Sequence, residues 1–165
     1  MNALLTLPAL LALALTPAPP TAAGPGAILE MQKALFAAID RGDGAAAGAF
    51  VAPDRKGPGG MTSLFLVDRS GAAISASDVA TAREALARLA AESKSAGGTF
   101  ETRITSENAD CPGSELSFAV LEFERRHTVG GKVETRRYRG TLLARHDGSE
   151  WKVCHWHVSP GSTRG

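Results

Sequence analysis

The sequence is poor in several residue types that often reveal a function. It has two cysteines, one tyrosine and 5% aromatic residues, and its formal net charge is +1. Charges of both signs are interspersed and no basic stripe occurs, so we expect no nucleic-acid partner. The sequence also lacks a G-x-S-x-G motif, a phosphate-binding loop and a dinucleotide fingerprint. We therefore expect no cofactor.

Long apolar runs are scarce as well. The one candidate, Leu4–Leu15, has the length of the apolar region of a signal peptide and is too short to span a bilayer. A proline-rich stretch ends it, and Ala22 and Ala23 are small residues suited to cleavage. No Lys or Arg precedes the run, so its start is atypical. We expect residues 1–23 to be a signal peptide and 24–165 to be one periplasmic or secreted domain, without a stable membrane span after processing.

The first part of the domain has the patterns of helices and one small hairpin. Apolar residues recur at helical spacing in two segments, and Asp43 and the pair Ser77-Asp78 are suited to cap helices. Gly42 and the pair Gly97-Gly98 are typical of helix ends. In chain order we expect a helix within 27–43, a short helix over 45–50, a hairpin over 61–75 and a helix over 79–94.

The second part consists of strands separated by turn signals. We expect long strands over 99–107, 115–129, 132–146 and 151–159. Long antiparallel strands twist into a curved sheet, and the helices must bury their apolar stripes against one face of it. The predicted fold class is α+β, with a four-stranded antiparallel meander plus a short hairpin wrapped around N-terminal helices. Such a sheet forms a cone with a pocket at its wide end.

The end of the chain resembles a known family. The stretch "RHDGSEWKVCHWHVSPG" is similar to the ending of SnoaL-like domains of the nuclear transport factor 2-like superfamily and of the calmodulin-dependent kinase II association domain. The start "ILEMQKALFAAIDRGDGAAAGAFVAPD" resembles their first helices, so the resemblance covers about residues 27 to 161. It implies a cone with a pocket but no single function, because members include cyclases, isomerases, dehydratases, binding modules and oligomerisation domains. The residues that match the ending are Trp151, Val153, His155, His157 and Ser159.

The sequence departs from the functional residues that this resemblance implies. The kinase association domain has two arginines that line an anion pocket, whereas Val158 and a position near Thr141 stand there in this chain. The cyclases use a strand carboxylate as a base, and no aspartate in the expected strands matches it. The isomerases pair a base aspartate with a tyrosine. Tyr138 is the only tyrosine, and no aspartate aligns with that base.

His155 and His157 are the first candidate site residues. They are two residues apart in an expected strand, so their side chains share one face. They could bind metal, act as acid and base, contact a ligand, or pack and hydrogen-bond at the end of the sheet. A metal needs a third ligand and an acid–base pair needs a partner that sets the pKa, and the motif contains neither. We expect no metal.

Arg137, Tyr138 and Arg139 complete the candidate ligand-binding set. Alternation along the strand places both arginines on one face and Tyr138 on the other. The alternative is a solvated strand face, because nearby glutamates balance this basic cluster. These glutamates are Glu122, Glu124 and Glu134.

The tryptophans and cysteines bear on assembly. Regular alternation would place Trp151 and Trp156 on opposite faces, and we take Trp156 as a candidate contact of a homodimer.

An even cysteine count in an exported protein suggests a disulfide. However, the expected meander separates Cys111, in a turn, from Cys154, in the middle of the last strand. We therefore expect no disulfide between them.

We interpret the chain as an exported SnoaL-like protein that binds a small, largely apolar molecule or serves as an accessory module, without established catalysis. Two alternatives remain open. One is a cofactor-free enzyme of isomerase, cyclase or hydratase type, which would need a deep pocket with a buried carboxylate beside His155. The other is an oligomerisation scaffold, which would have a filled cone and an apolar convex face.

Overall fold

The computed structural model describes residues 25–54, 62–112 and 115–161. The expected signal peptide, residues 1–23, lies outside these ranges. Within them, no helix is both long enough and apolar enough to cross a membrane.

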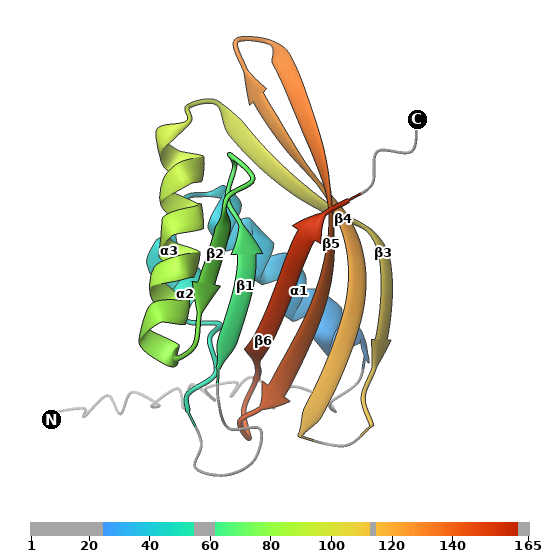
Figure 1. The fold of residues 1–165 in the computed structure, drawn as a ribbon. Helices are drawn as coiled ribbons and strands as arrows, with labels where there is room; N and C mark the ends of the chain where they lie inside the picture. Colours follow the sequence, from blue (N-terminus) through green and yellow to red (C-terminus); the bar gives the residue numbers. More distant parts are fainter. Residues whose placement is uncertain (1–24, 55–61, 113–114, 162–165) are drawn as a thin grey trace, which may run out of the picture.

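Three helices cover one face of the sheet (Figure 1). They are α1 (Pro25–Asp40), α2 (Gly44–Gly48) and α3 (Val79–Ser95). As expected, Asp43 caps α2 by accepting a hydrogen bond from the Ala46 amide, and Asp78 forms a capping box with Thr81 at the start of α3. Gly42, with a φ of 74°, ends α1, and a Cβ there would lie 2.9 Å from Cβ of Lys94. Glycine is therefore required where α1 passes close to α3.

Six strands form one curved sheet with the order β2-β1-β6-β5-β4-β3. The expected meander of four consecutive antiparallel strands is confirmed, and the β1–β2 hairpin is added to it by parallel pairing of β1 with β6. The strands are β1 (Ser63–Val67), β2 (Ala73–Ala76), β3 (Thr99–Asp110), β4 (Leu116–Val129), β5 (Lys132–His146) and β6 (Trp151–Pro160).

Two β-bulges change which side chains face the helices. The first lies at Thr105 in β3, and the second makes Cys154 the extra residue of β6. Side chains on either side of a bulge exchange their expected faces. Glu107 consequently points to the helix side of β3, and Trp156 shares the helix side of β6 with Trp151.

The core fills the space between the helices and the concave face of the sheet. Phe36 of α1 lies at its centre, with ring centroids 4.8 Å from Phe123 and 5.6 Å from Trp156. Trp156 is 2% exposed. The expectation that Trp156 lies exposed on the convex face as a dimer contact is therefore wrong, because the bulge at Cys154 reverses the alternation.

The cysteines lie where the meander places them, apart from a small shift. Cys111 follows the end of β3, and Cys154 lies within β6. Leu142 pairs with Ala119 of β4 on one side and with Trp156 of β6 on the other, so Cys154 lies two residues before the position opposite Leu142. Both thiols are free in this structure.

Candidate functional site

The two histidines lie on the convex face of β6, away from the helices. The Nδ1 atom of His155 is 2.8 Å from the Ser63 hydroxyl of β1. Partial burial lowers the pKa of His155, and the neighbouring His157 lowers it further. In the described part of the chain, no cluster of three His, Cys, Asp or Glu residues is arranged to hold a metal.

The two candidate arginines also lie on the convex face. Nε of Arg137 donates to Oε1 of Glu124 at 2.9 Å, and Nε of Arg139 donates to Oε1 of Glu122 at 2.9 Å. Both arginine side chains are more than half exposed. These contacts form cross-strand ion pairs on a solvated surface, and only Tyr138 among the three candidates points toward the helices.

The interior of the cone is nearly filled. A cavity of about 40 Å³ lies among Phe36, Phe123, Tyr138 and Trp156. Pockets that enclose drug-sized ligands measure roughly 300–1,000 Å³, so this cavity has room only for a few water molecules. The aromatic rings that fill the core occupy the volume where the resemblance predicts a pocket.

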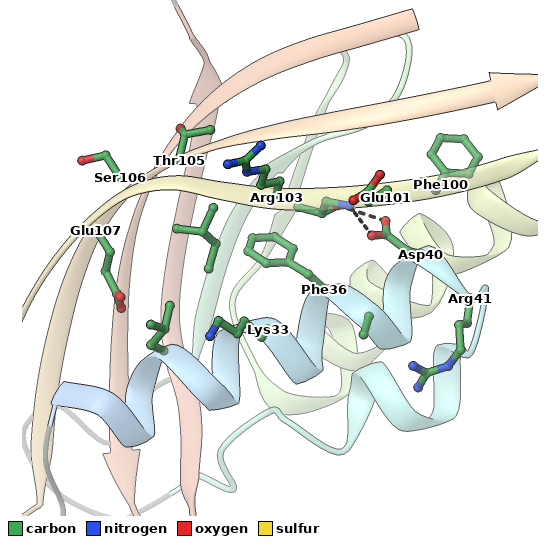
Figure 2. A pocket seen from close by; sticks show the side chains of 14 residues that line it. Lys33, Phe36, Asp40, Arg41, Phe100, Glu101, Arg103, Thr105, Ser106 and Glu107 are labelled. Carbon is green, nitrogen blue, oxygen red and sulfur yellow. Dashed lines mark hydrogen bonds between the residues drawn. The ribbon is translucent and has the colours of Figure 1, made fainter. Parts of the chain in front are cut away.

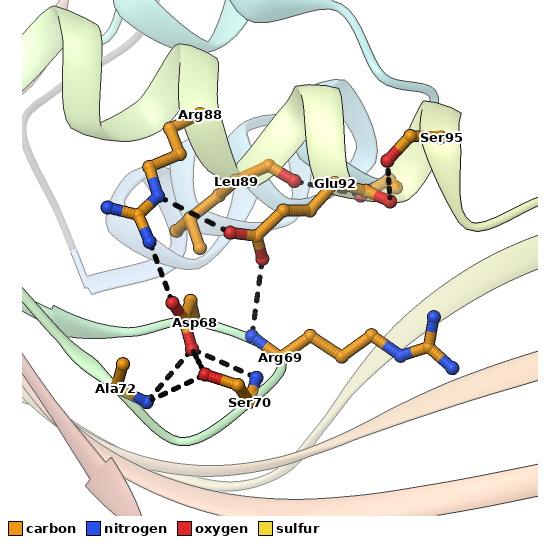
Figure 3. Close-up of polar contacts among 9 residues, drawn as sticks. Asp68, Arg69, Ser70, Ala72, Arg88, Leu89, Glu92 and Ser95 are labelled. Carbon is orange, nitrogen blue, oxygen red and sulfur yellow. Dashed lines mark hydrogen bonds and ion pairs between the residues drawn. The ribbon is translucent and has the colours of Figure 1, made fainter.

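Asp68, at the end of β1, also borders the interior, and its hydrogen bonds are saturated (Figure 3). Its carboxylate accepts hydrogen bonds from the hydroxyl of Ser70, from the amides of Ser70 and Ala72, and from Arg88 at 2.8 Å. The Ser70 hydroxyl has the largest effect and lowers the pKa of Asp68. An ionised carboxylate with this many donors holds the β1–β2 turn and is poorly suited to act as a base.

Asp40, at the end of α1, has a similar structural role. It accepts hydrogen bonds from the Thr102 amide at 2.6 Å, from the Thr102 hydroxyl at 3.0 Å and from Nε of Arg125 at 3.2 Å. Arg125 also donates to the Ser93 hydroxyl of α3 and lies over the ring of Phe100. This network joins two helices to two strands.

An open cavity lies between α1 and the edge strand β3 (Figure 2). It has a volume of about 680 Å³, within the range of small-molecule pockets. Leu29, Phe36 and Ile104 give it apolar lining, and charged side chains from α1 and β3 also line it. We call this cavity the α1–β3 groove.

Glu107 is the unusual residue of the α1–β3 groove. It points from β3 toward α1, at the same end of the groove as Lys33 (Figure 2). Its Oε1 atom is buried and has no hydrogen-bond partner. Burial raises the pKa of Glu107, and the charge of Lys33 offsets part of this rise. Sequence reasoning missed Glu107, because regular alternation from Ile104 would place it on the convex face.

A second feature is an apolar area on the convex face, which we call the convex patch and define as Phe65, Phe118, Val120 and Leu143. The side chains of Phe65, Phe118 and Val120 are between 40% and 49% exposed. Strand pairing places Val120 and Phe65 in one row across the sheet, with Thr141 and His157 between them. The histidines thus belong to an exposed, largely apolar surface.

The sequence matches no protein-family model and no curated protein. Solved structures, in contrast, match over most of the chain. A putative dehydratase of the NTF2-like family from Streptomyces avermitilis has a TM-score of 0.67 at 14% identity, over 82% of this chain and 95% of its own. This chain has the nuclear transport factor 2-like fold.

Two further structures share this NTF2-like fold. A putative calcium/calmodulin-dependent protein kinase II association domain from Xanthomonas campestris has a TM-score of 0.65 at 14% identity, over 88% of this chain and 94% of its own. The CaMKII hub of S. rosetta has a TM-score of 0.58 at 20% identity, over 84% of this chain and 98% of its own. The expected α+β cone is therefore confirmed.

Proposed function

We propose that this NTF2-like chain is a small-molecule-binding accessory domain without catalysis of its own, and that its ligand lies in the α1–β3 groove. The observation that carries the proposal is the groove itself. It offers about 680 Å³ with an apolar lining, whereas the cone interior offers about 40 Å³. Apolar lining with a few polar groups is typical of sites that bind small molecules.

The positions and hydrogen bonds of His155, Asp40 and Asp68 favour binding over catalysis by these three residues. A buried carboxylate beside His155 would support an enzyme, but His155 faces away from the helices. The carboxylates of Asp40 and Asp68 are occupied by donors of the protein itself. A catalytic base must be free to take a proton from a substrate, and neither carboxylate is free in this sense.

A pair of alanines on α1 tests the location of the ligand. Ala37 lines the groove, and Ala34, three residues earlier, is exposed outside it. We expect N-phenyl-1-naphthylamine, an uncharged fluorescent probe, to bind the wild-type chain saturably. Ala37→Trp should abolish the fluorescence increase by filling the groove, and Ala34→Trp should preserve it. No saturable binding, or equal binding by both folded variants, would refute the location.

The nearly filled cone and the convex patch are the two features expected of an oligomerisation scaffold, and they support a second element of the proposal, a homodimer. The patch is flanked by the ion pairs of Arg137 and Arg139, so this surface carries charges of both signs. In a dimer with a two-fold axis, the apolar patches of the two copies can face each other, and positive groups of one copy can lie opposite negative groups of the other. The Xanthomonas campestris and S. rosetta neighbours are named as association and hub domains. We propose that two copies pair through the convex patch.

We further propose that the chain is exported, on the basis of the apolar run Leu4–Leu15 and the small residues after it. The expected result of cell fractionation with N-terminal sequencing is a mature chain that begins near Gly24 outside the cytosol. An intact Met1 in the cytosolic fraction would contradict export.

A further inference from the structure

The geometry of the α1–β3 groove points to Glu107 as the residue that selects the ligand. We propose that the groove prefers uncharged apolar molecules that carry a hydroxyl group, and that this hydroxyl donates a hydrogen bond to the carboxylate of Glu107. The inference rests on the proposed function, because it assigns a ligand class to the same groove.

The β3 bulge is what brings Glu107 into the groove. Strand pairing shifts by one residue between Ile104 and Ser106, so Ser106 rather than Glu107 takes the convex side. The Thr105 hydroxyl donates to the Glu122 carbonyl at 3.1 Å, which ties the bulged residue to β4. Bulges on edge strands commonly re-aim a side chain beside a functional site. Here the re-aimed side chain is a carboxylate that faces the helix side of β3, where it lines the groove.

The carboxylate of Glu107 lacks a donor within the protein. Oε1 is shielded from solvent and has no hydrogen-bond partner among the described residues. Burying an acceptor without a donor is unfavourable, so a ligand that supplies the donor gains the full benefit of the new bond. Hydrogen bonds to charged groups correspond to about ten- to a hundredfold in affinity.

The charges near Glu107 favour an uncharged donor. Lys33 lies at the same end of the groove and acts electrostatically on Glu107. An ammonium group on a ligand would be attracted by Glu107 and repelled by Lys33. An anionic group would be attracted by Lys33 and repelled by Glu107. The other charged residues that line the groove also include both signs, namely Asp40, Arg41, Glu101 and Arg103. A hydroxyl donates to the Glu107 carboxylate without adding charge.

Two matched probes test the inference by calorimetry, namely 2-naphthol, which has the hydroxyl, and 2-methoxynaphthalene, which has an ether in its place. The wild-type chain should bind 2-naphthol at least about tenfold more tightly. Glu107→Leu should remove this preference by weakening 2-naphthol binding. Glu84→Leu, which removes an exposed carboxylate on α3, should keep the preference.

The possible outcomes separate the two proposals. If wild-type protein binds neither probe, the proposed function fails. If it binds both equally, or if the preference persists in Glu107→Leu, the hydroxyl inference fails while binding in the groove stands.

An NMR titration of the Glu107 carboxyl in the wild-type chain gives a readout that does not depend on the folding of a variant. A donor to the charged form lowers a pKa, so saturating 2-naphthol should lower the pKa of Glu107, and 2-methoxynaphthalene should not. A pKa that is unchanged with 2-naphthol bound would overturn the inference.

Discussion

The Trp156→Ala variant is expected to have a free energy of unfolding about 3–5 kcal/mol below that of the wild-type chain. The indole is 2% exposed and packs edge-on against Phe36 of α1. It also lies on Gly140 of β5, where a Cβ would be 3.3 Å from the indole Nε1. Truncation removes most of this contact and leaves a cavity between the sheet and α1. Urea denaturation followed by circular dichroism measures the difference.

His157→Ala is the control for this variant, because His157 is the exposed neighbour on the convex face. Its effect on the free energy of unfolding should stay within about 0.5 kcal/mol. A Trp156→Ala variant that is as stable as His157→Ala but no longer dimerises would restore the original expectation of Trp156 as an interface residue.

The Val120→Arg variant is expected to be monomeric at concentrations at which the wild-type chain is dimeric. Val120 is 49% exposed on the convex face, so arginine can be accommodated in the monomer without disturbing the core. In the proposed dimer the same side chain is buried against a second apolar patch. An unpaired charge there costs several kcal/mol, and the two-fold axis makes each dimer carry it twice. Sedimentation-velocity runs over a dilution series measure the change.

Val133→Arg provides the matched control. Val133 is 52% exposed, near the tip of the β4–β5 hairpin. It pairs with Thr128, eight residues along β4 from Val120, or about 26 Å away. This variant should remain dimeric. A wild-type chain that is monomeric at micromolar concentration, or loss of the dimer in both variants, would contradict pairing through the convex patch.

The sequence predicted the fold well because long-range periodicity and local turn signals agree along most of it. Alternation set the strands, and Gly130-Gly131 set the hairpin between β4 and β5, which has the expected bounds of 132–146 for β5. The caps at Asp43 and Asp78 began helices where expected. The strand expected over 99–107 ends too early, because β3 continues through a polar stretch to Asp110.

The site was harder to predict than the fold. The faces of Trp156 and Glu107 were both expected wrongly, and in each case the cause is a β-bulge. A bulge inserts one residue without changing the local composition, so a period of two continues in the sequence while the faces exchange in the sheet. At Cys154 this moved Trp156 from the expected surface into the core. At Thr105 it moved Glu107 into the groove. The filling of the cone depends on how Phe36 meets Phe123 across the core, and periodicity carries no such information.

Binding of the ligand in the α1–β3 groove is tested most directly by a ¹H–¹⁵N correlation spectrum of the wild-type chain titrated with 2-naphthol. If the ligand lies in the α1–β3 groove, amide shifts change along α1 from Lys33 to Asp40 and along β3 from Thr102 to Glu107, the two walls of the groove. Changes that cluster instead at Tyr138 and the Trp156 indole, with unchanged shifts for the groove amides, would place the ligand inside the cone and contradict binding in the groove.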